Sequence, residues 1–144
     1  MSEEPYARGI VPERPFVAVA AMEGHFVAVL GVRFTDRNLE LETVRARAFP
    51  DGSIAECCVT DEPHATPGKV VARAAYLGFI RFARGGVIAT GMECRIGEEV
   101  VGEVVGFDGV HAPNHWTIVV RSGWFADGGE RGIQTGQTVT FQYR

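Results

Sequence analysis

Two histidines and an aspartate lie within eight residues of one another in the segment VVGFDGVHAPNHWTIVV, residues 104–120. They are Asp108, His111 and His115, and apolar β-type residues flank them on both sides. Imidazole changes charge near neutral pH and binds transition metals, while a carboxylate can orient an imidazole or ligate a metal itself. The segment therefore predicts a functional turn between two strands.

The backbone between the two histidines decides whether their rings can act together. In an extended strand His111 and His115 would be roughly 13 Å apart, which is too far to share one ion. Pro113 and Asn114 favour a turn, and a turn there brings the flanking residues back towards each other. We therefore expect the two imidazoles to converge and, with Asp108, to hold a divalent metal ion (Zn, Fe or Mn) with one open position.

Two other interpretations of the same residues remain open. Without a metal, His115 would be the general base and His111 the acid, with Asp108 orienting one ring. Alternatively, Asp108 with Gly109 is a hairpin turn whose carboxylate bonds its own backbone, and the histidines have no chemical role.

Five further residues are candidates for substrate binding. Arg81 lies in an apolar run, and Arg84 precedes two glycines, so either could hold an anionic group through bidentate hydrogen bonds. Arg81 faces the barrel interior in one register and solvent in the other. Glu103 is a candidate internal partner or acid, Tyr76 is a weaker candidate of the same kind, and Trp116 is a candidate pocket wall.

The remaining histidines and the cysteines are expected to have no site function. His25 and His64 lie in segments that read as loops, where a solvated imidazole is the simplest interpretation. Cys57 and Cys58 are adjacent and point to opposite faces of a strand, and Cys94 is isolated. This pattern is neither a disulfide framework nor a metal-binding clip, and it favours a reducing cytosol.

Composition excludes several classes of protein. A chain of 144 residues with 46% apolar and 22% charged content is ordinary for one globular domain. A net charge of −4 argues against a nucleic-acid-binding module, which needs a basic stripe. The acidic start MSEEPYARG lacks the apolar core of a signal peptide, and no apolar run is long enough to cross a membrane.

The pattern of apolar residues predicts an all-β fold. We expect a flexible arm over residues 1–14 and one domain over 15–144, with a hairpin formed by the two FVAV runs and the intervening MEGH turn. Residues 38–49 read as a bulged strand or, alternatively, a helix, and residues 67–77 read as a short helix or a strand. The later segments read as successive strands separated by turns, at 92–96, 100–107, 115–121 and 137–144.

Seven or eight short, half-buried strands close most economically into a small, mainly antiparallel β-barrel, with a β-sandwich as the other possible fold. The resulting functional hypothesis is a cytosolic barrel enzyme of hydrolase, lyase, isomerase or cyclase type. It would act on a small molecule, an anionic one if Arg81 or Arg84 binds it. A non-catalytic ligand-binding barrel, or an accessory subunit using its loop at 122–131, is the alternative. A homodimer is a further hypothesis, because small barrels often pair through an exposed apolar face.

Overall fold

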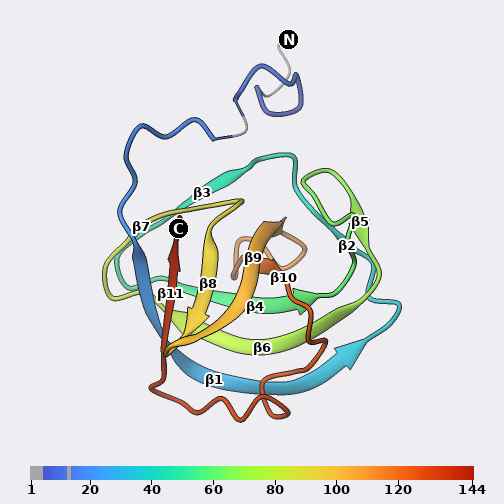
Figure 1. The fold of residues 1–144 in the computed structure, drawn as a ribbon, viewed down its shortest axis with the longest axis vertical. Coiled ribbons are helices and arrows are strands. Elements are labelled where there is room, and N and C mark those ends of the chain that lie inside the picture. The colour runs from blue at the N-terminus through green and yellow to red at the C-terminus, as the bar shows by residue number, and fades with distance from the viewer. Residues whose placement is uncertain (1–4, 13) are drawn as a thin grey trace.

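A computed structural model describes residues 5–12 and 14–144, and it confirms the all-β prediction. Seven strands form a closed barrel, coloured from blue to red along the chain in Figure 1. The barrel strands are β1 (Met22–Phe34), β4 (Ile54–Thr60), β6 (Ala74–Arg81), β8 (Glu93–Ile96), β9 (Glu99–Asp108), β10 (Thr117–Arg121) and β11 (Thr138–Gln142). Two two-stranded sheets complete the fold: β2 (Leu39–Glu40) with β5 (Val70–Val71), and β3 (Ala46–Phe49) with β7 (Gly86–Ala89).

The order of strands around the barrel is β1-β11-β8-β9-β10-β4-β6. Every pair in the barrel is antiparallel except β10 with β4, which is parallel in the register Thr117↔Glu56 to Arg121↔Thr60. This parallel pair joins segments that are about sixty residues apart in the chain, and it places Glu56 beside the loop that precedes β10.

Alternating side chains of the barrel strands form two apolar clusters. The interior cluster is built around phenylalanines, with the rings of Phe82 and Phe141 centred 6.3 Å apart and those of Phe49 and Phe82 centred 5.5 Å apart. A smaller cluster lies outside the barrel wall, where residues such as Leu39 are fully covered. Each fully buried side chain of this size contributes about 1.5–3 kcal/mol.

Cys57 and Cys58 illustrate how the two clusters share one strand. Both are completely buried, yet Cys57 belongs to the interior cluster and Cys58 to the outer one. This confirms that the adjacent cysteines point to opposite faces. All three cysteines are free thiols.

The expected hairpin over residues 16–29 is wrong, because MEGH lies inside β1. Residues Met22–His25 pair in register with Thr138–Phe141 of β11, so the segment continues as a strand. Gly24 does not form a turn, and it is required because neighbouring side chains leave no room for a Cβ atom. A Cβ atom at this position would lie 2.5 Å from the Ile80 side chain and 2.9 Å from that of Phe82.

The expected helix over 67–77 is also wrong, whereas the strand interpretation of this segment is correct. Gly68 has a φ of +87°, and Val70–Val71 pair with Leu39–Glu40 before the chain enters β6. Nearly every residue of β6 is buried, because one face lines the barrel and the other lies under the outer cluster. Continuous burial removes the alternation that identifies a strand in the sequence.

Residues 38–49 are neither a continuous bulged strand nor a helix. The segment contains the short strands β2 and β3, which pair with β5 and β7 respectively, and residues 41–45 separate them. The expected arm over residues 1–14 lies partly outside the described residues. From Pro5 onward the chain runs outside the barrel before entering β1 (Figure 1).

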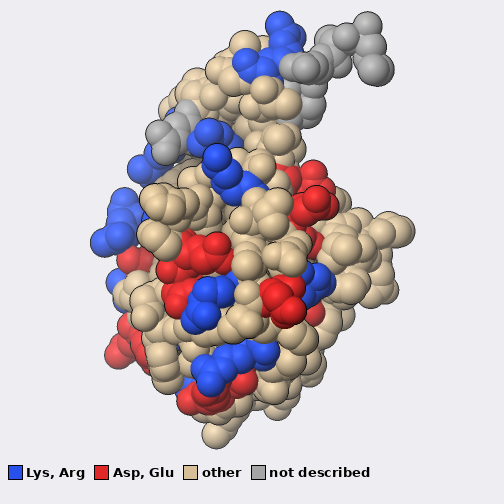
Figure 2. Space-filling model, turned by 90° about the vertical axis from the view of Figure 1, so that its right-hand side faces the viewer, with Lys and Arg blue, Asp and Glu red and all other residues tan. Residues whose placement is uncertain are grey.

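Charged side chains of both signs are interspersed on the face shown in Figure 2, so no single-sign stripe covers it. In the part of the chain that the structure describes, no helix is long and apolar enough to cross a membrane.

Candidate functional site

The turn after β9 brings the two predicted imidazoles together. Ala112 N–H donates to the Gly109 carbonyl at 2.9 Å, His115 N–H donates to the His111 carbonyl at 3.3 Å, and the Ala112–Pro113 peptide is cis. The rings of His111 and His115 lie close together, with centroids 4.9 Å apart and planes tilted by 34°. His111 is exposed, while the His115 side chain is only 11% exposed.

Asp108 faces the backbone instead of the histidines. Its Oδ1 accepts a hydrogen bond from Val110 N–H at 2.9 Å, and its Oδ2 accepts one from Glu40 N–H at 3.0 Å. The residue is 3% exposed and joins the end of β9 to β2. The turn interpretation of this carboxylate accounts for the contact with Val110. The contact with Glu40 is long-range and attaches β9 to β2.

Glu56 is the carboxylate that the structure places beside His115. Its Oε1 lies 3.7 Å from His115 Nε2 and accepts a hydrogen bond from the Thr117 hydroxyl at 2.8 Å. The edge-to-face ring of Phe79, centred 5.1 Å away, covers the same imidazole. Glu56 occupies an apolar strand segment with no sequence motif around it, so only the pairing of β4 with β10 identifies it.

The orientation of the His115 ring follows from its other nitrogen. Asn114 Nδ2 lies 2.9 Å from His115 Nδ1, and an amide N–H donating there leaves the ring proton on Nε2. Nε2 is buried and has no hydrogen-bond partner among the described residues. A proton donor therefore faces the Glu56 carboxylate just beyond hydrogen-bond distance.

The metal prediction is not resolved by this arrangement. Within the described residues, no group of three or more His, Cys, Asp or Glu side chains is arranged to hold a metal ion. Binding of Zn, Fe or Mn at His111 and His115 stays a prediction.

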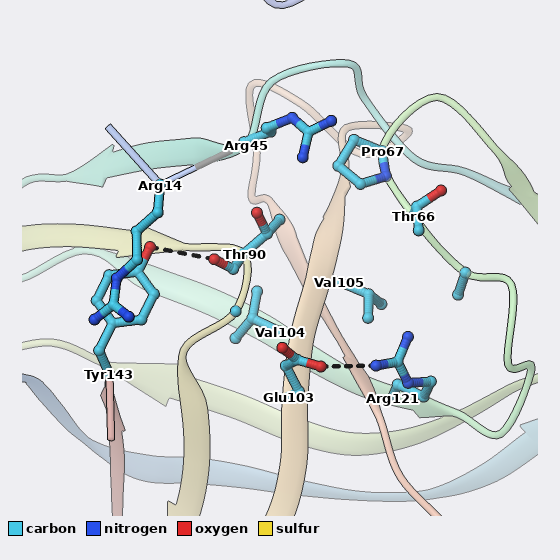
Figure 3. A pocket seen from close by; sticks show the side chains of 12 residues that line it. Arg14, Arg45, Thr66, Pro67, Thr90, Glu103, Val104, Val105, Arg121 and Tyr143 are labelled. Carbon is cyan, nitrogen blue, oxygen red and sulfur yellow. Dashed lines mark hydrogen bonds and ion pairs between the residues drawn. The ribbon is translucent and has the colours of Figure 1, made fainter. Parts of the chain in front are cut away.

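A separate, polar pocket of about 650 Å³ lies near the other end of β9 and β10 (Figure 3). Its walls come from the N-terminal arm, the segment before β3, the loop before β5, the β7–β8 turn, β9, β10 and the end of the chain. The lining residues are Arg14, Arg45, Ala65, Thr66, Pro67, Thr90, Gly91, Glu103, Val104, Val105, Arg121 and Tyr143.

Three contacts order the pocket wall. Arg121 donates to Glu103 Oε2 at 2.7 Å, which joins β10 to β9. The Tyr143 hydroxyl donates to the Thr90 carbonyl at 3.2 Å, and the Arg14 guanidinium lies 3.6 Å above the centre of the Tyr143 ring. Partial burial raises the pKa of Tyr143, so the phenol stays neutral in the physiological range.

Arg45 contributes a cation with no counter-ion in the described chain. Its guanidinium makes no hydrogen bond or ion pair with residues 5–12 or 14–144, although its carbonyl accepts from Thr90 N–H at 2.8 Å. Of the residues predicted to bind substrate, only Glu103 lines this pocket. Sequence reasoning missed Arg14, Arg45 and Arg121, which belong to three segments that only the fold brings together.

The pocket and the histidine turn are separate places. Thr117, next to His115, pairs with Asp108, whereas Arg121, at the other end of β10, pairs with Glu103. Four strand residues correspond to about 13 Å. A small ligand held by Arg121 would therefore not reach the His115 imidazole.

The other predicted binding residues lie elsewhere. Arg81 and Arg84 are exposed, so the register of β6 turns Arg81 towards solvent and not into the barrel. Tyr76 is buried under the outer cluster and accepts a hydrogen bond from Arg37 Nε at 2.8 Å, and desolvation raises its pKa. The Trp116 ring lies 3.3 Å below the Arg47 guanidinium.

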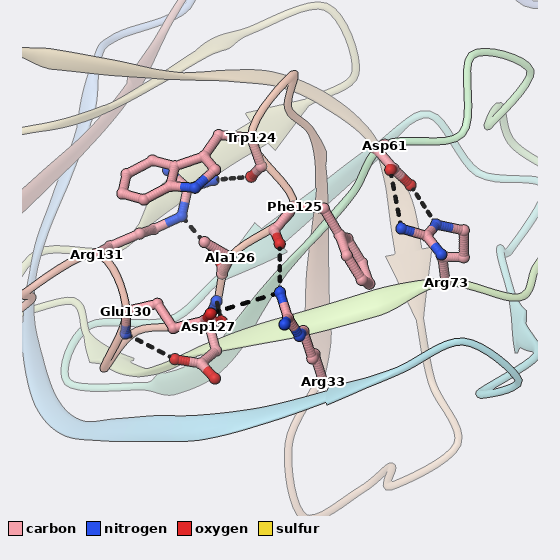
Figure 4. Close-up of polar contacts among 9 residues, drawn as sticks. All are labelled: Arg33, Asp61, Arg73, Trp124, Phe125, Ala126, Asp127, Glu130 and Arg131. Carbon is pink, nitrogen blue, oxygen red and sulfur yellow. Dashed lines mark hydrogen bonds and ion pairs between the residues drawn. The ribbon is translucent and has the colours of Figure 1, made fainter.

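The 122–131 loop is held by its own side chains (Figure 4). Arg131 donates to the carbonyls of Ala126 and Trp124, and its guanidinium lies 4.7 Å from the Trp124 ring centre. Asp127 and Glu130 exchange hydrogen bonds between their backbone amides and carboxylates at 2.8 and 3.1 Å. Trp124 nevertheless remains 50% exposed.

Comparison with known proteins identifies a family but no activity. Residues 17–142 match the model of a family described as "Family of unknown function (DUF6917)", and the chain belongs to this family. No curated protein and no solved structure matches the chain.

Proposed function

Since family membership carries no activity, we propose from the geometry that this protein binds a small anionic organic molecule in the arginine-lined pocket. The observation that carries the proposal is the Arg45 guanidinium, which lines the pocket without a counter-ion in the described chain. A guanidinium presents a planar fork of donors that matches carboxylate and phosphate oxygens.

The size and chemistry of the pocket support a small organic ligand. A volume of about 650 Å³ falls within the roughly 300–1,000 Å³ range that is usual for small-molecule sites. Thr66 and Thr90 supply polar groups on the wall, and Val104 and Val105 supply an apolar patch. Such a combination can orient a ligand as well as hold its charge.

The charge balance of the pocket supports an anion. Arg14, Arg45 and Arg121 carry three positive charges, and Glu103 carries the one negative charge among the lining side chains. The overall chain has a net charge of −4, so this local excess of positive charge opposes the general trend. Clefts lined by one sign of charge concentrate ligands of the opposite sign.

The test is a thermal-shift and calorimetry screen with inorganic phosphate, sulfate and citrate. We expect at least one of these anions to raise the melting temperature of the wild type, and Arg45→Ala to weaken that anion's binding at least tenfold. Arg84→Ala is the matched control, because Arg84 is equally cationic but exposed and outside the pocket. The proposal fails if no anion binds, or if the two variants bind the anion equally well.

A second candidate function, favoured by the buried His115 Nε2 facing Glu56, is proton transfer at the outer face of the barrel. In this version His115 is the general base, oriented by Glu56 where we expected Asp108, and His111 is the acid. The reaction would be of the hydrolase, lyase, isomerase or cyclase type. A positioned acid or base typically contributes about 10²–10⁴-fold to a rate.

The proton-transfer function is tested in a substrate screen with His115→Ala and Glu56→Gln. Both substitutions should lower turnover by orders of magnitude in folded protein, whereas His64→Ala should leave it unchanged. Elemental analysis of untagged protein tests the metal-assisted version: near-stoichiometric Zn, Fe or Mn that is lost in His111→Ala supports it. Unchanged turnover in His115→Ala excludes both versions.

The proposed compartment is the cytosol, which agrees with three cysteines that remain free thiols. The proposed assembly is a homodimer. Light scattering coupled to size-exclusion chromatography tests it by measuring the mass of the protein in solution.

A further inference from the structure

The N-terminal arm brings a second counter-ion-free cation to the pocket. Arg14 lies on this arm, and among the described residues its guanidinium contacts the Tyr143 ring but no carboxylate. The arm itself is attached to the barrel, because Phe16 and Val19 pack against the interior cluster. Arg14 is therefore held over the pocket by a nearby apolar anchor.

Arg14 and Arg45 occupy different sides of the pocket (Figure 3). Both are linked to the same residue: the Arg45 carbonyl accepts from Thr90 N–H at 2.8 Å, and Tyr143, below Arg14, donates to the Thr90 carbonyl at 3.2 Å. This shared attachment joins the Arg45 backbone and the Tyr143 ring, which lies under Arg14, to the same residue of the barrel.

The third arginine is already neutralised. Arg121 forms an ion pair with Glu103 at 2.7 Å, and both side chains remain partly exposed, at 35% and 45%. Among the described residues, the pocket cations without a carboxylate partner are therefore Arg14 and Arg45, on separate walls. An anionic group beside each of them would give each guanidinium its own bidentate partner.

Building on the proposed function, we propose that the ligand carries two anionic groups, one bound by Arg45 and the other by Arg14. Carboxylate and phosphate groups serve this purpose alike, because the guanidinium fork fits both. The ligand thereby ties the N-terminal arm to the barrel. Glu103, within the pocket, can accept hydrogen bonds from hydroxyl groups between the two anionic ends.

The experiment compares ligands with one and two anionic groups by calorimetry on the full chain. Acetate and inorganic phosphate carry one such group, and succinate and 3-phosphoglycerate carry two. We expect at least one two-group probe to bind ten or more times tighter than its one-group counterpart. Arg14→Ala should abolish this difference, because it weakens the two-group probe at least tenfold and weakens the one-group probe far less.

Arg8→Ala is the matched control, since Arg8 is an exposed arginine on the same arm that does not line the pocket. It should bind all four probes like the wild type. A second readout is backbone hydrogen exchange over residues 14–21, which should slow with the two-group probe and remain unchanged with the one-group probe.

The outcomes separate this inference from the proposal on which it rests. Equal binding of one-group and two-group probes, with loss of both in Arg45→Ala, overturns the two-group inference and leaves anion binding intact. A two-group advantage that survives Arg14→Ala overturns the role of the arm. Absence of binding by all four probes overturns both proposals.

Discussion

His115 Nε2 lies 3.7 Å from Glu56 Oε1, and the same carboxylate oxygen accepts the Thr117 hydroxyl at 2.8 Å. Both side chains of the His115–Glu56 pair are almost fully covered, at 11% and 10% exposed. The carboxylate therefore accepts a hydrogen bond from Thr117 and faces the His115 imidazole at the point where β4 and β10 run parallel. Its removal has consequences for stability as well as for any chemistry of the histidine.

Glu56→Ala should destabilise the protein by about 1–3 kcal/mol, because it leaves the buried Thr117 hydroxyl without its acceptor. Glu56→Gln keeps an oxygen at the same place and should cost less. Urea denaturation measures the free energy of unfolding, and Glu23→Ala, an exposed glutamate on β1, is the control. Equal destabilisation by the alanine and glutamine variants would show that the hydrogen-bond acceptor at residue 56 does not contribute to stability.

Gly102→Ala should destabilise the barrel and distort the pocket. A Cβ atom at Gly102 would lie 1.8 Å from the Arg121 carbonyl oxygen, so β9 and β10 must move apart. We expect a loss of about 1–3 kcal/mol, as for other overpacked sites, together with weaker anion binding because Glu103 and Arg121 are displaced.

Gly123→Ala is the matched control for this substitution, because a Cβ there meets nothing within 4 Å. Thermal melting of the two variants should differ clearly. If Gly102→Ala and Gly123→Ala have the same melting temperature, the close approach of β9 and β10 does not constrain the barrel.

The buried thiols should be unreactive in the folded protein. Burial raises the pKa of the Cys58 thiol, and both a hydrogen bond with Cys57 and burial raise that of Cys94, so the reactive thiolate is scarce. A thiol reagent at pH 8 should label neither residue before unfolding and all three cysteines in urea. Rapid labelling of the native protein would mean that the barrel opens readily.

Asp61 should make stability depend on acid pH. A hydrogen bond from Arg73 Nε, at 2.7 Å, is the main cause that lowers the pKa of Asp61. A carboxyl whose pKa is lower in the folded state stabilises the protein above its ordinary pKa, and this contribution is lost as the pH falls. The pair is partly exposed, so the effect is small and weakens with salt.

The measurement is the free energy of unfolding of Asp61→Asn against pH, relative to wild type. The wild type should be more stable near neutrality, and the two curves should converge below pH 4. If the two free energies of unfolding differ by the same amount at every pH, the effect does not come from the ionisation of Asp61.

The sequence alone supports the barrel and several of its strands. Burial alternates in β11, whereas β10 and the second half of β9 are buried on both faces and are recognised from β-branched runs bounded by turn residues. β6 is also buried on both faces, but the Thr66–Pro67 pair before it resembles a helix start, and the glycine-containing start of β1 resembles a turn.

The candidate site also contains residues that the sequence identifies and residues that it does not. Convergence of His111 and His115 follows from local turn chemistry around Pro113, which is encoded within five residues. Glu56 could not be found in this way, because its place beside His115 depends on the parallel pairing of distant strands.

The pocket is the feature that the sequence identifies least well, because its charged residues come from four separate segments: Arg14, Arg45, Glu103 and Arg121. Local periodicity and turn propensity act over a few residues and are readable in sequence order. Strand order and long-range register are set by how the whole core packs, and they alone decide which distant charges become neighbours.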